Sequence, residues 1–165
     1  MPGRSPGELG AVGDEARPAL AVLNLTIALC SLVFAYGLLS FAGQSELTGA
    51  PAYLVGFLAI PAVGLAAFPT PHRLHNVFGL LQIVSFIGAP LTAALTWQNQ
   101  PTVILLSWTE LAVQVVALIL NLAPAFSPRV REAFAPVYDL IQRLVFVAWY
   151  GWYAALGLLL FLRHS

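Results

Sequence analysis

The amino-acid sequence predicts an all-α membrane protein, built as a bundle of five transmembrane helices with very little soluble chain. Five apolar stretches, each long enough to cross a bilayer, occupy nearly all of residues 20–162. Of the 165 residues, 59% are hydrophobic and only 8% are charged, whereas charged residues make up about 25% of an average soluble domain. Two of the connections between the stretches are short, so the helices that they join are expected to pack antiparallel.

A polar segment precedes the first helix. Residues 1–18 are rich in glycine and proline and carry five charged side chains, so they cannot bury enough apolar surface to fold. We expect this segment to be disordered in the cytoplasm. It makes a poor signal peptide, because the apolar run after it is too long for the core of such a peptide. Residues 19–163 are expected to form one transmembrane domain.

The first three helices are placed by their apolar runs and by prolines. The first is expected over residues 20–42. The second, over residues 51–68, is short and contains Pro61, which lacks an amide hydrogen and is expected to kink it. The third is expected over residues 75–97, after a proline-rich turn.

The last two helices complete the bundle. The fourth is expected over residues 101–122, and we expect Pro124 to end it because proline cannot continue the hydrogen bonding of a helix. The fifth is expected over residues 136–162. Each of the five spans reaches or approaches the ~20 residues that a ~30 Å hydrocarbon core requires.

The placement of arginine predicts the orientation of the bundle. With five spans, all arginines but Arg163 lie on one side of the membrane or at that end of a helix. Those arginines are Arg4, Arg17, Arg73, Arg129, Arg131 and Arg143. By the positive-inside rule, the N-terminus is expected in the cytoplasm and the C-terminus outside.

One acidic residue is expected deep in the membrane. Glu110 lies about 13 Å into the fourth helix at 1.5 Å per residue, near the midplane, where a carboxylate is costly and usually faces a bundle interior. Its helix face also carries Ser107, Gln114 and Asn121. A polar stripe on the third helix includes His75 and Gln82. These stripes either only join the two helices or form a site for a proton, an ion or a ligand.

A second polar group gathers at the helix ends that face the cytoplasm in this topology. Its members are Asn24, His75, Asn76, Asn121, Asp139, Gln142 and Arg143. Asp139 and Arg143 are spaced to pair along one helix face, and the planar arginine fork suits a carboxylate or a lipid phosphate. The group is either an ion pair with an arginine that reaches toward the headgroups or a pocket for a lipid headgroup or a small anion.

The composition argues against several chemistries. Lysine is absent, so neither a retinal nor a pyridoxal Schiff base can form. Cys30 is the only cysteine, and we interpret it as a packing residue. His72 and His75 are too few ligands for a metal site, and the third histidine falls across the membrane.

With zero formal net charge, we expect no nucleic-acid partner, and we also expect no metal and no cofactor. An aromatic cluster in the fifth helix suits packing better than a pigment site.

Two stretches resemble one known family. Residues 71–81, running on to Pro90 and Leu91, are similar to the start of the third helix in the family called domain of unknown function 998. Residues 138–143, followed by Trp149, are similar to the closing Gly-Leu-Gln-Arg and Trp pattern of that family, with Asp139 in place of its usual glycine. The members are small bacterial and archaeal integral membrane proteins.

The resemblance implies a shortened, five-helix form, because a further first helix and an Ile-Ser-Asp-Leu-Gly-like loop of the family are missing. It highlights His75, Gln142 and Arg143. It implies no reaction, because the family is itself uncharacterised.

These observations favour a multi-pass protein of the prokaryotic cytoplasmic membrane that binds or handles a lipid or another apolar small molecule, and a binding protein more than an enzyme. One alternative is a structural or regulatory subunit of a larger membrane complex. Its partner, another membrane protein or a second copy of this chain, would pack against a face of small residues such as Ala52/Gly56 or Gly151/Ala155. Another is a small intramembrane enzyme or proton-coupled carrier that uses Glu110. The binding protein and the enzyme both need a polar interior cavity, whereas the subunit needs a filled core.

Overall fold

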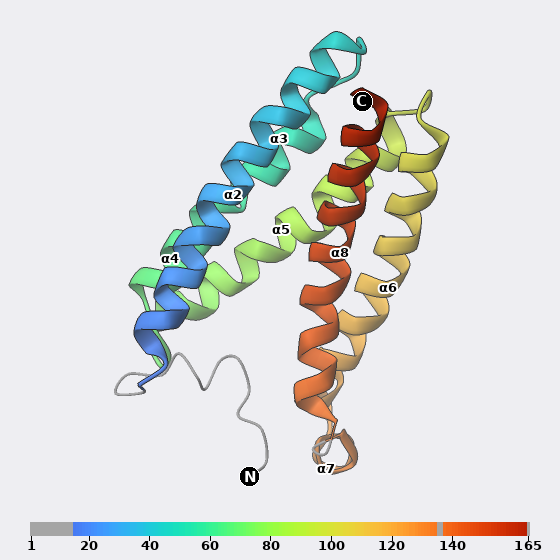
Figure 1. Ribbon diagram of the computed structural model, residues 1–165. Coiled ribbons are helices and arrows are strands. Elements are labelled where there is room, and N and C mark those ends of the chain that lie inside the picture. The colour runs from blue at the N-terminus through green and yellow to red at the C-terminus, as the bar shows by residue number, and fades with distance from the viewer. Residues whose placement is uncertain (1–14, 135–136, 165) are drawn as a thin grey trace.

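The computed structural model describes residues 15–134 and 137–164, and within these residues the chain is all-helical (Figure 1). The helices are α2 (Arg17–Gln44), α3 (Ala50–Phe57), α4 (Ala59–Ala67), α5 (Arg73–Thr96), α6 (Pro101–Phe126), α7 (Pro128–Phe134) and α8 (Tyr138–His164). Five spans are long and apolar enough to cross a membrane, with α3 and α4 together forming one of them. The predicted fold class is therefore confirmed, and the orientation of the bundle stays a prediction.

The second span is broken rather than merely bent. The α-helix stops after α3 and resumes as α4, with Leu58 between them. Pro61 lies three residues further on, inside α4. It has no amide hydrogen to donate toward the carbonyl of Phe57, and its ring crowds that carbonyl. The predicted effect of this proline is thus found one turn before the proline itself.

The prediction that Pro124 ends the fourth helix is wrong. Helix α6 continues through Pro124 to Phe126. A proline near the end of a helix removes a single backbone hydrogen bond, here the one to Leu120, and its fixed φ is compatible with helical geometry. The short helix α7 comes directly after it and was also not predicted. The first, third and fifth spans extend two or three residues beyond at least one of their predicted ends, whereas the second is displaced by only one residue.

The spans form two limbs (Figure 1). We call α2, α3 and α4 the α2–α4 limb, because α2 packs along both α3 and α4. We call α6 and α8, which also pack along each other, the α6–α8 limb. Helix α5 crosses diagonally between them: it contacts α4 and α3 in one limb and α6 in the other. The limbs diverge toward the end of the bundle where α2 and α5 begin (Figure 1).

Small residues bring the backbones close in the α2–α4 limb. A Cβ added at Gly56 of α3 would lie 3.3 Å from the Cβ of Ala35 in α2. A Cβ at Gly88 of α5 would lie 3.2 Å from the side chain of Leu54 in α3. A Cβ at Gly64 of α4 would fall on the ring of Phe78 in α5. Helices approach this closely in membranes where glycine or alanine lies at the contact.

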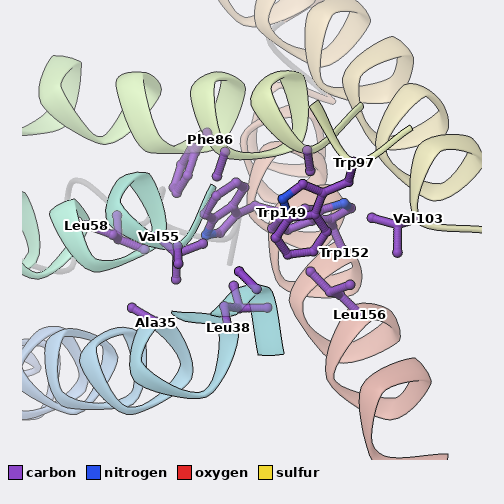
Figure 2. Packing of buried hydrophobic residues seen from close by; sticks show 14 of the residues in the cluster. Ala35, Leu38, Val55, Leu58, Phe86, Trp97, Val103, Trp149, Trp152 and Leu156 are labelled. Atoms are coloured by element: carbon purple, nitrogen blue, oxygen red, sulfur yellow. The ribbon is translucent and has the colours of Figure 1, made fainter. Parts of the chain in front are cut away.

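Large aromatic residues fill the junction of the two limbs. Trp149 and Trp152 of α8 are both buried, and their rings stack with centroids 5.6 Å apart. Figure 2 shows their indoles pointing from α8 into a cluster that Phe86 of α5 also joins. On α2, Phe34 contacts Tyr153 of α8 with ring centroids 4.9 Å apart. This contact marks the level at which the two limbs meet.

The outward faces of the helices are apolar and exposed. Leu29 and Val33 of α2 and Leu105, Val116 and Ile119 of α6 each expose more than half of their area. A soluble monomer rarely exposes contiguous apolar surface on this scale. The surface is that of helices in contact with lipid tails, in keeping with the five spans.

Candidate functional site

A cavity of about 490 Å³ lies where the limbs diverge. Its walls come from α2, α4, α5, α6 and α8, at the end of the bundle where Arg17 begins α2. That volume falls within the range of small-molecule sites, about 300–1,000 Å³. Most of the lining is apolar, with Leu20, Ile27, Leu65 and Leu118 among it. A cavity of this size and character suits a small molecule with a large apolar part.

Polar side chains from three helices line the same cavity. They are Asn24 of α2, His75 and Gln82 of α5, and Asn121 of α6. Gln82 is only 7% exposed and, with Phe86, lies toward the inner end of the cavity. The Nδ2 of Asn24 donates to the carbonyl of Leu20, 3.0 Å away, which holds that side chain against its own helix. Amide groups both donate and accept hydrogen bonds, so these residues can hold a polar head of either kind.

A packed corner holds His75 in place. The α4–α5 connection brings the carbonyl of Phe68 to 3.0 Å from Nδ1 of His75. The ring of Phe68 in turn stacks on Phe78, with centroids 5.7 Å apart. Because a carbonyl only accepts, Nδ1 carries a hydrogen, and Nε2 of the neutral ring is an acceptor. His72, by contrast, accepts from the backbone N–H of Leu74 at 3.2 Å and caps α5.

The cavity is open at its sides. Leu23 of α2 and Tyr150 of α8 both line it, and they expose 52% and 37% of their area. Both residues belong to membrane-spanning helices. Arg17, also exposed, lines the cavity nearest the end of the bundle. A ligand can therefore place its apolar part among the helices and a polar head near Arg17.

Glu110 lies outside this cavity, in the interior between α5, α6 and α8. It is 5% exposed, and Gln114 and Ser107 on the same helix face are fully buried. Nε1 of Trp152 in α8 donates to Oγ of Ser107 at 3.0 Å. Phe86 lines the cavity on one side and contacts Trp149 on the other, with ring centroids 4.9 Å apart. Phe86 thus lies between the cavity and the buried residues Ser107, Glu110 and Gln114, whereas Asn121 of the same helix lines the cavity.

A family model described as "Protein of unknown function (DUF998)" matches residues 8–159. The chain belongs to this family. The match confirms the resemblance seen in residues 71–91 and 138–149 of the sequence. No curated protein and no solved structure matches the chain.

In this DUF998 chain, the structure brings together only part of the predicted polar group. Asn24, His75 and Asn121 of that group line the cavity, and Gln82 of the predicted stripe on the third helix joins them. Asn76 and Arg143 are exposed and do not line it. The side chains of Asp139 and Gln142 lie outside the part of the chain that the structure describes. The predicted pair of Asp139 with Arg143 therefore stays a prediction.

Among the cavity residues with charged or hydroxyl side chains, Arg17 and Tyr150 are not part of either polar group that the sequence predicts. Arg17 belongs to the polar N-terminal segment of the sequence, although its seven-residue spacing to Asn24 places both on one helix face. Tyr150 belongs to the predicted packing cluster, but it is exposed at the cavity wall. Its neighbours Trp149 and Trp152 are fully buried packing residues. Helical periodicity therefore places the two tryptophans on the packed face of α8 and Tyr150 on a different face.

Proposed function

We propose that this DUF998 protein binds an amphiphilic small molecule, such as a lipid, in the cavity between its two limbs, within the cytoplasmic membrane of a prokaryote. The observation that carries the proposal is the combination of about 490 Å³ of largely apolar volume with His75, Gln82 and Asn121 among the residues that line it. Apolar walls with a few convergent polar groups are the usual make-up of a ligand site.

The shape of the cavity supports an amphiphile more than a water-soluble ligand. The exposed lining residues Leu23 and Tyr150 lie on membrane-spanning helices, so the cavity opens beside lipid tails. Arg17 lies at the end where headgroups are expected. A guanidinium there suits a phosphate or carboxylate head, while the amides further in suit a hydroxyl or ester group.

The alternative of a structural subunit has less support. It requires a filled core, whereas the space beside Gln82 and Phe86 is a cavity. One of the two small-residue faces proposed for a partner is used inside the chain, since Ala52 is fully buried and Gly56 packs near Ala35. At the other face, Gly151 is exposed and Ala155 is partly buried, which by itself is a common feature of a helix in lipid.

The experiment compares two glycine substitutions by native mass spectrometry in a mild detergent. Gly79 lines the cavity, and a Cβ added there meets no atom within 4 Å, so Gly79→Leu fills the cavity without straining the backbone. Gly151 of α8 has equally open space around its Cβ but does not line the cavity, so Gly151→Leu is the matched control. Both changes replace a glycine inside a helix and raise helix propensity alike.

The expected result is a bound mass on the wild-type protein and on Gly151→Leu that is largely lost from Gly79→Leu. Lipid extraction and mass analysis then identify the molecule. Equal retention by all three proteins, or no bound mass on the wild type after addition of total bacterial lipid, contradicts the proposal.

A further inference from the structure

Several buried polar atoms between α5, α6 and α8 have no hydrogen-bond partner among the described residues. They are both carboxyl oxygens of Glu110, both amide atoms of Gln114, Oγ of Ser85 and Nε1 of Trp149. All four residues are at least 95% buried. Buried polar groups in proteins are almost always paired, with protein atoms, water or a ligand. Partners other than the described side chains must therefore lie in this cluster.

The four side chains lie within about one helical turn of the same level of the bundle. The bond from Trp152 to Ser107 sets the antiparallel register of α6 and α8, and moving one turn along each helix brings Glu110 level with Trp149. Helices α5 and α6 run antiparallel from the connection at residues 97–100, and Ser85 and Gln114 are about equally far from it. The contact of Phe86 with Trp149 puts α5 at the same level.

The Glu110 carboxyl has no cation beside it in the described part of the chain. The arginines whose side chains the structure describes are Arg17, Arg73, Arg129 and Arg143, and all are exposed. An ionised carboxylate without a partner is very costly at such a position. Either a proton or a bound cation must therefore neutralise it.

The chemistry of the cluster favours a proton over a metal ion. Among the described residues, no group of three or more His, Cys, Asp or Glu side chains could hold a metal. Several of the groups around the carboxyl are N–H donors, including the indole of Trp149 and the amide of Gln114. N–H donors repel a cation but bond to a carboxyl group or to water.

Polar groups also continue from this cluster toward the cavity. On α6, Gln114 lies one turn from Glu110 in the direction of the cavity residues Leu118 and Asn121. On α5, Ser85 lies one turn from Gln82, which lines the cavity. Phe86 and Phe146, which both line the cavity, meet edge to face with ring centroids 6.1 Å apart. Gln114 on α6 and Gln82 on α5 thus lie between the Glu110 carboxyl and the cavity.

We propose that Glu110 is a proton-binding site: its carboxyl is held as a neutral acid, bonded to internal water and to its neighbours, and exchanges its proton through the cavity. On release, the O–H bond breaks, its electron pair stays on the carboxylate oxygen, and a water molecule in the cavity takes the proton. The other titratable groups at this level are Tyr150 and Tyr153 of α8, since α5 offers only Arg73 and His75 at its far end. The site does not depend on which molecule the cavity binds.

Infrared spectroscopy of the purified protein in lipid tests the proposal. A protonated carboxylic acid has a carbonyl stretch well separated from that of a carboxylate, so wild type minus Glu110→Gln isolates the signal of this residue. At neutral pH we expect an acid band in the wild type that Glu110→Gln lacks. The exposed loop residue Glu46 provides the control, because Glu46→Gln should leave the band unchanged. Transfer to heavy water should shift the band as the proton exchanges.

Three results overturn the proposal. One is the absence of an acid band at neutral pH, which shows that the carboxylate is ionised. Another is a band that disappears when sodium is added at constant pH, which shows a cation site. The third is a band that heavy water never shifts, which shows that no proton reaches the cavity.

A chemical label covers the case in which Glu110→Gln fails to fold. Dicyclohexylcarbodiimide is an apolar reagent that takes up the acid proton on nitrogen and bonds to the carboxyl oxygen, and the adduct rearranges to a stable acylurea. All atoms are kept, so the wild-type peptide containing Glu110 should gain the mass of the reagent. The exposed residues Glu46 and Glu132 serve as internal controls and should stay unlabelled. Labelling of those peptides but not of Glu110 contradicts the proposal.

Discussion

The α2–α4 limb is held by close approach of small residues, whereas the α6–α8 limb is held by large rings and polar side chains. Gly56, Gly64 and Gly88 let backbones and side chains meet at short distance in and beside the first limb. In the second limb, a Cβ at Gly151 meets nothing within 4 Å, and the contacts come from Trp149 and Trp152 instead. The first limb is closely fitted, and the second contains polar atoms without a described partner.

The two limbs are therefore expected to respond differently to substitution. Close backbone contact in a membrane gains van der Waals energy and has little tolerance for added atoms. In the second limb, the contacts are spread over the large ring surfaces of Trp149 and Trp152. We infer that the α2–α4 limb contributes more to stability, whereas the α6–α8 limb carries the buried residues Glu110 and Gln114, with α5 packed against both limbs.

The largest effect is expected where the first limb is tightest. In Gly64→Ala, the new Cβ would fall on the ring of Phe78, which Phe68 stacks against and keeps from moving freely. Overpacking of this kind lowers the free energy of unfolding by about 1–3 kcal/mol. Reversible unfolding in detergent mixtures measures it. Gly79→Ala on the same helix as Phe78 has open space at its Cβ and should not destabilise; equal loss in both variants would refute the steric argument.

A smaller effect is expected from the side-chain hydrogen bond that joins α6 to α8. Ser107→Ala and Trp152→Phe each remove the bond from the Trp152 indole to Ser107. In a double-mutant cycle, the coupling energy should be about 0.6 kcal/mol and at most about 1.7 kcal/mol, as for other hydrogen bonds in membranes. A coupling energy above that range would show that the second limb also depends on a few specific contacts.

The smallest effect is expected at Gln114. Its amide is fully buried and bonds to no described residue, so Gln114→Leu removes bonds to internal water rather than to protein and puts an apolar group of similar size in its place. The free energy of unfolding should change by less than about 0.5 kcal/mol, the low end of one hydrogen bond. A loss as large as that of Gly64→Ala would remove the contrast between the limbs.

The spans could be predicted from the sequence because hydrophobic length is a local property of each segment. The break near Pro61 was predictable for the same reason, since it results from the missing amide of one residue. The continuation of α6 past Pro124 was not, because whether a helix survives one lost hydrogen bond depends on the structure of the residues beyond the proline. Here α7 begins two residues after α6 ends.

The sequence predicted how far along the bundle each site residue lies, but not which of these residues face the cavity. The sequence placed Asn24, His75 and Asn121 near one end of the bundle, and all three line one cavity. It could not place Gln82 there and Glu110 behind Phe86, because that depends on how steeply α5 crosses its neighbours. The corner at Phe68 that holds His75 depends on a backbone carbonyl, which leaves no signal in residue types.

Because α5 crosses the bundle diagonally, a small rotation about one of its ends would produce a large displacement of the other end. Helix α5 has 24 residues and is therefore about 36 Å long at 1.5 Å per residue. Its far end is fixed by Trp97, whose Nε1 donates to the carbonyl of Thr48 at 3.0 Å. A pivot of about 5° around that end would move the opposite end by about 3 Å over such a length, nearly the width of a methylene chain. Such a pivot would change the width of the cavity, which lies at that opposite end.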